Sequence, residues 1–427
     1  MRLSLLHKPA LSLTLLTFCF AIASGTKAAA VSLSVVADGL DNPRGLNFGP
    51  DGSLYVTESG VGGEGRCIPG PSLEGLLSCA GNSGAVTRIT DTQQERVVTG
   101  LPSTALRPIG ATAAGPHDIQ FDTAGNPYVL IGYGGKPGVR DFPEGSPNWG
   151  QLYKADFNTG SLTSLADFAS YELANNPDGA ETLDVSGEIA TNAYAFTIKD
   201  GNAYVVDAAA NTLSSVGLDG SNFRVVSVLP TQPISNPVFP TPGPGQVAPP
   251  EAPPPGQIPD QIQIQSVPTG VTVGPDGAFY VSEFTGFPFP VGAARILRVS
   301  ADGETTVYAD GFTQLADLEF DRKGNLYALQ YANQPQWAGI SDASVIQISP
   351  DGTRTTLISS NELESPTALA VGPDDAVYIS NRGDRAQVGQ VLRLETAEAV
   401  PEPTTLLGML TFGAYGVVSF LKRKINA

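Results

Sequence analysis

The stretch GLNFGPDGSLYV at residues 45–56 consists of an apolar strand, a Pro-Asp-Gly turn and a second strand that contains a tyrosine. Five further stretches repeat this scheme: DIQFDTAGNPYV at 118–129, AFTIKDGNAYV at 195–205, GVTVGPDGAFYV at 270–281, DLEFDRKGNLYA at 317–328 and ALAVGPDDAVYI at 368–379. Two alternating apolar runs at nearly constant spacing, separated by Pro-Asp-Gly or Asp-x-x-Gly, predict a β-hairpin. Six copies of one unit predict a repeat architecture.

A second pair of strands follows several of these hairpins, such as GAVTRIT at 84–90 and ERVVTGL at 95–101. Four strands joined by tight turns are typical of one blade of a β-propeller. The sixth unit offers only a third strand, VGQVLRLE at 388–395, whereas SLSVVADGL at 32–40 repeats the ending of the strand at 305–312. We therefore predict an all-β, six-bladed propeller over residues 31–398, in which the amino-terminal strand completes the last blade. A closed ring leaves no long strand edge open, and we expect a monomer.

Residues 1–30 have the pattern of a secretory signal peptide. Arg2 and Lys8 precede an apolar core at 11–22, and Ala28-Ala29-Ala30 stands before the first strand. A small-residue site after a short apolar segment predicts cleavage and export, with an amino-terminal membrane anchor as the alternative.

The carboxyl-terminal residues 399–427 form a second targeting segment. Pro401-Glu402-Pro403 precedes an apolar run at 406–421 and a basic end at 422–424, which predicts a membrane segment with its far end in the cytoplasm. This order resembles the PEP-CTERM sorting tail of bacterial exported proteins. The resemblance implies processing by an exosortase-type enzyme, after transient residence in the inner membrane. It also implies a final location in the periplasm, on the outer surface or outside the cell; a plain single-span anchor is the alternative.

The charge of the body limits its partners. Of the 24 basic and 42 acidic residues, six basic residues and one acid fall in the two ends, which leaves 18 and 41 and a net charge near −23. Such a surface repels phosphate backbones and argues against a nucleic-acid partner. It suits a divalent cation or a neutral organic ligand, and much of it is the solvated surface of an acidic protein.

Cys67 and Cys79 are the cysteines that remain after removal of the signal peptide, and both lie in a glycine-rich loop at 63–86. In an exported protein this pair predicts a disulfide, with a two-thiol metal site as the alternative. A second insertion, at 230–260, is rich in proline. We expect it to form an extended excursion without ladder strands, because proline lacks the backbone donor.

His117 is the one histidine of the mature chain, which excludes sites that need several histidines. Alignment of the six first strands at their starting residues predicts a group of polar side chains at one mouth of the channel. Its members are Arg44, His117, Asp118, Tyr194, Thr269, Asp317 and Thr367. They offer a cation, an imidazole, a phenol and two carboxylates to a small aromatic or acidic ligand. The alternative is that these are strand-end residues whose hydrogen bonds are satisfied within the protein.

A second polar set follows the repeated tyrosines. Its members are Glu58, Asp207, Glu283, Gln330 and Asn381. Oxygen-only clusters suit Ca²⁺, and propeller lactonases place Glu, Asn and Asp around such an ion. Acidic residues at strand ends are also common on any soluble propeller.

Several stretches are more specific than a propeller requires. They include NPRGLNFGPDGSLYVTESG at 42–60, NNPDG at 175–179, QSVPTGVTVGPDGAFYVSEFTGFPFPVGAARI at 265–296 and VYISNRG at 377–383. Over about residues 33–394 the chain resembles the ScyD/ScyE family of exported cyanobacterial proteins, which are related to NHL-type propellers. Some members accompany the pathway for scytonemin, an extracellular indole-phenol pigment, and no catalytic residue follows from the resemblance. It implies a role in late pigment or secondary-metabolite assembly; a calcium-dependent or oxidative-coupling enzyme and a structural matrix protein are the alternatives.

Overall fold

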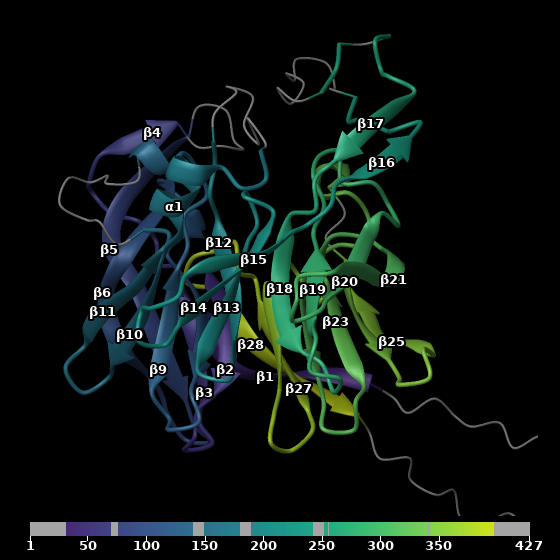
Figure 1. Cartoon of the computed structure of the whole chain (residues 1–427). Helices are drawn as coiled ribbons and strands as arrows, with labels where there is room; N and C mark the ends of the chain where they lie inside the picture. The colour runs from purple at the N-terminus through teal and green to yellow at the C-terminus, as the bar shows by residue number, and fades with distance from the viewer. Residues whose placement is uncertain are drawn as a thin grey trace, which may run out of the picture. The chain divides into compact units, whose positions relative to one another are not determined.

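Six antiparallel sheets form the blades of a propeller around a central channel (Figure 1). The computed structural model describes residues 31–69, 76–139, 149–179, 189–241, 252–254, 256–339 and 342–396. From the channel outward, blade 1 contains β2 (Pro43–Phe48), β3 (Leu54–Glu58), β5 (Leu77–Ile89) and β6 (Gln94–Arg107). Blade 2 contains β8 (Pro116–Phe121), β9 (Pro127–Ile131), β10 (Gln151–Asp156) and β11 (Ser161–Asp167). Blade 3 contains β12 (Ala193–Lys199), β13 (Asn202–Asp207), β14 (Thr212–Gly217) and β15 (Arg224–Val228). Blade 4 contains β18 (Pro268–Val273), β19 (Phe279–Glu283), β20 (Ala294–Val299) and β21 (Thr305–Phe312). Blade 5 contains β22 (Leu315–Phe320), β23 (Leu326–Gln330), β24 (Ala343–Ile348) and β25 (Arg354–Ser360). Blade 6 contains β26 (Ala368–Val371), β27 (Val377–Asn381), β28 (Gly389–Thr396) and β1 (Val31–Leu40).

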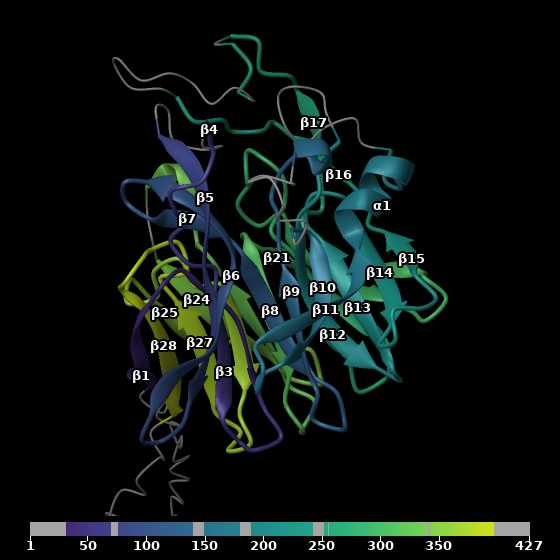
Figure 2. The same cartoon turned by 90° about the vertical axis from the view of Figure 1, so that its left-hand side faces the viewer.

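The two ends of the described chain close the ring. β1 pairs with β28 as the outermost strand of blade 6 (Figure 2). The innermost strands contact one another in the order β2, β8, β12, β18, β22 and β26, and β26 in turn contacts β2. The prediction of a six-bladed propeller completed by the amino-terminal strand is confirmed.

The hydrophobic core consists of layers between neighbouring blades. Between blades 1 and 2, Tyr55 and Val86 pack with Ile119 and Val129, all nearly inaccessible to solvent. The layer between blades 6 and 1 has the same character, since Leu40 of β1 packs with residues of both blades. Burial of each large aliphatic side chain stabilises by about 1.5–3 kcal/mol, so the closing layer contributes to holding the ring together.

The repeated tyrosine is explained by the turn of each hairpin. Tyr55 donates a hydrogen bond to the turn residue Asp51 (3.2 Å), and Tyr128 does the same to Asp122 (3.1 Å). Equivalent pairs occur in blades 4, 5 and 6. Blade 3 has the shorter turn, and there Tyr204 instead packs on Phe279 with ring centroids 4.1 Å apart. A turn aspartate that also caps its own loop therefore fixes the hairpins of blades 1, 2, 4, 5 and 6.

The additional elements gather at one face of the ring. The tight hairpins lie at what we call the turn face, and the innermost strands begin at the opposite face, the mouth face (Figures 1 and 2). β4 (Cys67–Pro69), β7 (Ala111–Ala114) and α1 (Phe168–Asn175) all join the blades at the mouth face. Cys67 pairs with Cys79 across β4 and β5, and the predicted disulfide joins them.

The base of the proline-rich insertion contains a strand that the sequence did not predict. β16 (Gln232–Ser235) pairs with β17 (Gln261–Ile264), so the expectation of no ladder strand within 230–260 is wrong at its base. Pro233 is tolerated because each strand of a two-stranded ribbon has one open edge. The proline-rich residues 242–251 lie outside the described residues.

The predicted targeting segments are not part of the described structure. Residues 31–395 form one compact unit, and both the signal peptide (1–30) and the sorting tail (399–427) with Pro401, Glu402 and Pro403 lie outside the described residues. Within the ranges that are described, no helix is long and apolar enough to cross a membrane.

Candidate functional site at the channel mouth

The innermost strands begin at the mouth face with an irregular step. In β8, β12, β18 and β22 one extra residue interrupts the pairing with the second strand: His117, Tyr194, Thr269 and Ala316. β2 carries a similar shift between Pro43 and Leu46. A β-bulge of this kind changes the direction of the side chains near it. Consecutive residues such as His117 and Asp118 therefore both line one cavity.

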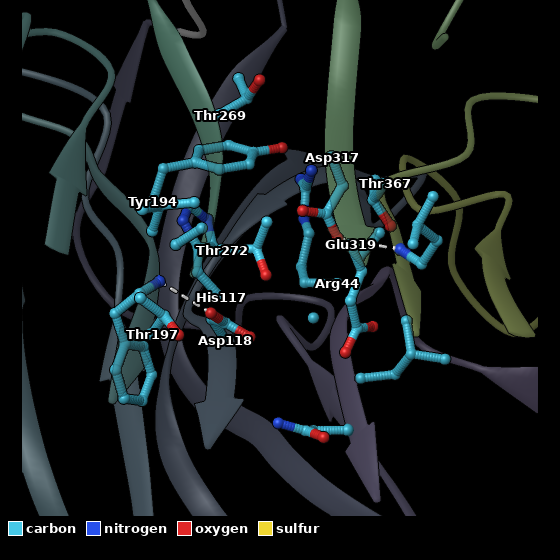
Figure 3. Close-up of a pocket in the computed structure, with 18 of the residues that line it drawn as sticks. Arg44, His117, Asp118, Tyr194, Thr197, Thr269, Thr272, Asp317, Glu319 and Thr367 are labelled. Atoms are coloured by element: carbon cyan, nitrogen blue, oxygen red, sulfur yellow. Dashed lines mark hydrogen bonds between the residues drawn. The ribbon is translucent and has the colours of Figure 1, made fainter. Parts of the chain in front are cut away.

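The cavity has a volume of about 70 Å³ and lies at the mouth end of the channel (Figure 3). All seven residues predicted from the strand alignment line it: Arg44, His117, Asp118, Tyr194, Thr269, Asp317 and Thr367. A second polar layer of the lining, which the alignment of strand starts did not identify, is formed by Asn47, Gln120, Thr197, Thr272 and Glu319. These stand two residues after Gly45, Asp118, Ala195, Gly270 and Asp317 in the same strands, so the period of two along a strand was the available signal.

Two carboxylates tie the innermost strands of neighbouring blades together. Asp118 accepts hydrogen bonds from the backbone N–H of Ile119 (2.7 Å) and from that of Phe196 in blade 3 (2.8 Å). Asp317 accepts from Leu318 (2.8 Å) and from Leu369 in blade 6 (2.9 Å). Glu319 adds a third link, to the N–H of Val371 (2.8 Å). These carboxyl groups are structural ties as well as cavity walls.

The same carboxyl groups hold protons strongly. Burial raises the pKa of Asp118 to about 8 and that of Asp317 to about 7, and Asp317 adds to the effect on Asp118. Burial also raises the pKa of Glu319 to about 8. Removal from water disfavours the charged form, and the accepted N–H bonds offset only part of that cost. At neutral pH the floor of the cavity is therefore partly protonated.

His117 and Tyr194 form one wall. Their ring centroids lie 5.0 Å apart, and the imidazole hydrogen-bonds to the backbone of Ala193. Burial, assisted by the charge of Arg44, lowers the pKa of His117 to about 3, so the ring is neutral at physiological pH. A Cβ atom at Gly132 would stand 2.0 Å from Nδ1 of His117, and the glycine is what makes room for the ring.

An aromatic rim lies at the mouth face, where β19 and β23 end. Phe284 packs on Phe289 and on Tyr331 with ring centroids 5.7 and 5.3 Å apart. Trp337 donates a hydrogen bond to the carbonyl of Pro288 (2.8 Å) and so fixes the Phe-Pro-Phe-Pro loop. Burial raises the pKa of Tyr331, and the charges of Arg44 and Tyr194 also act on it, which places its hydroxyl near the cavity residues.

The lining shows that the ring consists of two similar halves. Blades 1 and 4 share Gly-Pro-Asp-Gly turns, and blades 2 and 5 share Asp-x-x-Gly-Asn turns. Equivalent lining positions are Arg44 and Thr269, Gly45 and Gly270, His117 and Ala316, Asp118 and Asp317, and Tyr194 and Thr367. The ties made by Asp118 to blade 3 and by Asp317 to blade 6 are thus the same feature in both halves.

The second polar set does not form a metal site. Glu58 is held by Arg96 (2.6 Å) and Glu283 by Arg295 (2.6 Å), each within its own blade. Asp207 accepts from Thr191 (2.6 Å) and from three backbone N–H groups; Asn381 accepts from Glu364, and Gln330 accepts from the N–H of Thr313. Nowhere in the described ranges do three His, Cys, Asp or Glu side chains lie where they could hold a metal ion. These residues do not fit the predicted Ca²⁺ site, because their oxygens are already occupied in separate blades.

No protein-family model matches the sequence, and neither does any curated protein. Among solved structures, a gluconolactonase from Xanthomonas campestris aligns over 86% of this chain and 90% of its own, with 11% identity and a TM-score of 0.45. A glucose dehydrogenase aligns over 85% and 99%, with 13% identity and a TM-score of 0.46. Virginiamycin B lyase from Staphylococcus aureus aligns over 86% and 98%, with 12% identity and a TM-score of 0.41. At such values the similarities carry no conclusion about chemistry.

Proposed function

We propose that this protein is an exported propeller that binds a small organic ligand at the channel mouth. The observation that carries the proposal is the cavity itself, since residues of all six blades meet in it. A depression with a cation, a neutral imidazole, phenols and protonated carboxyl groups offers both hydrogen-bond donors and acceptors to a ligand. The gathering of the insertions at the same face supports this assignment, because binding residues tend to stand on loops above a rigid scaffold.

The resemblance to the ScyD/ScyE family suggests the setting of this binding. In this proposal the ligand belongs to late extracytoplasmic assembly of an indole-phenol pigment or a related secondary metabolite. The sorting tail at 399–427 and the signal peptide at 1–30 give the route, namely export followed by exosortase-type processing. Mass spectrometry of the protein recovered from the cell exterior tests the route: we expect ends after Ala30 and near Pro401–Pro403, and an intact tail would contradict it.

Titration calorimetry with an indole joined to a phenol ring tests the binding. We expect saturable binding by the exported protein and its loss in a His117→Ala, Arg44→Ala double variant. Arg224→Ala, an exposed position on β15, is the matched control and should bind normally. Absence of binding by the intact protein would contradict the proposal.

The same samples separate the other classes of function. Chemical analysis of the probe after incubation reports any turnover, and turnover would make the protein an enzyme rather than a binding module. Chelation of divalent cations should leave binding unchanged, because the second polar set does not converge. Dependence on Ca²⁺ that disappears in Glu283→Gln would instead favour a calcium-dependent hydrolase.

A further inference from the structure

Arg44 carries a positive charge that the described residues do not neutralise. Its guanidinium donates one hydrogen bond, from Nη2 to the carbonyl of Ala113 (2.7 Å), while its Nε–H is buried without a partner in the described part of the chain. Other arginines at the mouth face are paired: Arg385 lies 2.6 Å and Arg382 3.4 Å from carboxylate oxygens of Glu364. A buried donor without an acceptor is costly, and a ligand that supplies the acceptor gains most from it.

The position of Arg44 directs this charge into the cavity. Figure 3 shows Arg44 between the wall formed by His117 and Tyr194 and the opposite wall, where Asp317 and Thr367 stand. Arg44 and His117 line the same cavity, and the charge of Arg44 lowers the pKa of His117.

Comparison of the halves shows that this arrangement is not needed to build a blade. The positions equivalent to Arg44, His117 and Tyr194 carry Thr269, Ala316 and Thr367. Thr269 donates to the carbonyl of Leu315 (2.7 Å) and Thr367 to that of Pro43 (2.8 Å), so these residues tie strands together. Arg44 makes the corresponding tie through one nitrogen, to the carbonyl of Ala113, and its positive charge and the two rings come in addition to that tie.

We propose that the mouth recognises an aromatic monocarboxylate, with its carboxylate on Arg44 and its ring against Tyr194 beneath the aromatic rim. This inference rests on the proposed function and names its class of ligand. A cavity of about 70 Å³ accepts the acid group and little more, so the ring of the ligand remains in the mouth above it. A carboxylate pairs with a guanidinium through charge-assisted N–H bonds, and Arg44 lines the cavity in which such a group would sit.

The charges below the site limit the ligand to a single negative charge. Asp118, Asp317 and Glu319 form the floor, and a second anionic charge would add to the repulsion that already disfavours their ionised forms. An organic cation is disfavoured for the opposite reason, because it would meet the unpaired guanidinium. Phosphate monoesters and amines are therefore expected to bind poorly.

Titration of the exported protein with three small probes tests the inference. Para-hydroxybenzoate has the ring and the charge, para-hydroxybenzamide has the ring without the charge, and cyclohexanecarboxylate has the charge without the aromatic ring. We expect para-hydroxybenzoate to bind about 10- to 100-fold more tightly than either of the others. Arg44→Thr, which installs the residue found in blade 4, should remove that advantage, and Arg44→Lys should keep part of it, since the charge remains without the fork.

The controls distinguish this inference from the function on which it rests. Arg224→Thr removes an exposed arginine of blade 3 and should leave all three affinities unchanged. Equal binding of the acid and the amide, unaffected by Arg44→Thr, would overturn the inference and leave ligand binding at the mouth intact. If cyclohexanecarboxylate binds as tightly as para-hydroxybenzoate, the aromatic ring of the ligand does not contribute to recognition, which would also overturn the inference. If neither aromatic probe nor the indole-phenol probe binds, both proposals are wrong.

Discussion

Blades 1–3 and blades 4–6 follow one plan, and the features that differ between them separate support from recognition. Both halves contain a glycine that makes room for an aspartate, and that aspartate ties two innermost strands. At three mouth positions the first half has Arg44, His117 and Tyr194, where the second half has two threonines and an alanine. What the halves share holds the ring together, and what only the first half has is available for a ligand.

The largest loss of stability is expected from substitution of the glycines that make room for the shared aspartates. A Cβ atom at Gly45 would lie 2.3 Å from a carboxylate oxygen of Asp118, and one at Gly270 would lie 2.5 Å from the equivalent oxygen of Asp317. Gly45→Ala and Gly270→Ala should each destabilise the fold by about 3 kcal/mol or more, because backbone and carboxylate must both move. Urea unfolding measures this. Gly138→Ala, with nothing within 4 Å of the new carbon, is the control and should change stability by less than about 0.5 kcal/mol.

The next largest loss of stability is expected from replacement of the shared carboxylates, Asp118 and Asp317. Asp118→Asn and Asp317→Asn each leave one backbone N–H without its acceptor, at a cost of about 1–3 kcal/mol near pH 5. Similar losses in the two variants would support equal roles in the two halves. A loss confined to one variant would show that the halves are not equivalent.

The pH dependence of these variants sharpens the test. A raised carboxyl pKa means that the native state keeps protons that the unfolded state releases. Asp118 therefore contributes stability that is full below its ordinary pKa of 3.8 and is lost as pH rises through its folded value of about 8. The unfolding free energy of the wild type should fall as pH rises from about 4 to about 8, and that of each Asn variant should fall less. A wild type with constant stability over this range would contradict the assignment.

A smaller loss of stability is expected from His117→Ala, which places alanine where the second half has Ala316. The buried ring leaves a cavity, and the cost should be about 1–3 kcal/mol in urea unfolding at neutral pH. Because the pKa of His117 is lowered, the wild type loses stability as pH falls below 6.5, and the variant should lose less there. Ala316→Gly, at the equivalent position of blade 5, provides a matched truncation.

The smallest effect lies at the turn face, where the halves agree. Tyr55→Phe and Tyr280→Phe each remove one hydrogen bond to a turn aspartate, at a cost of about 0.5–1 kcal/mol. Tyr204→Phe should cost almost nothing, because its hydroxyl makes no hydrogen bond among the described residues and its ring packs on Phe279. Thermal unfolding of the three variants provides the measurement, and an equal loss in Tyr204→Phe would contradict the role of the turn aspartate.

The sequence predicted the fold and the mouth well because both depend on local patterns. Five of the six hairpins are fixed within about twelve residues by a turn aspartate and a tyrosine. Alignment of the six units placed Arg44 and His117 at one level. For the second polar set the local pattern was not sufficient, because the ion pairs of its members depend on residues outside the repeated hairpin. Glu58 and Glu283 are paired with Arg96 and Arg295, at separations of 38 and 12 residues that follow no repeat spacing. Glu319 was missed because the alignment considered only the residues at the start of each innermost strand, although Glu319 stands two residues after Asp317.

The closure of blade 6 by β1 also brings both ends of the compact unit to the turn face. The carboxyl-terminal end of β28 pairs with the start of β27, so Leu394 lies opposite Val377 beside the turn face, and Ser34 of β1 bonds to Glu395 there (2.9 Å). Both ends of the compact unit therefore leave on the side away from the cavity. An attachment through either terminus, to a lipid bilayer, to a sorting enzyme or to an affinity resin, holds the protein by its base. Access to the mouth then stays open, and a captured protein and a released one should bind the same ligands equally well.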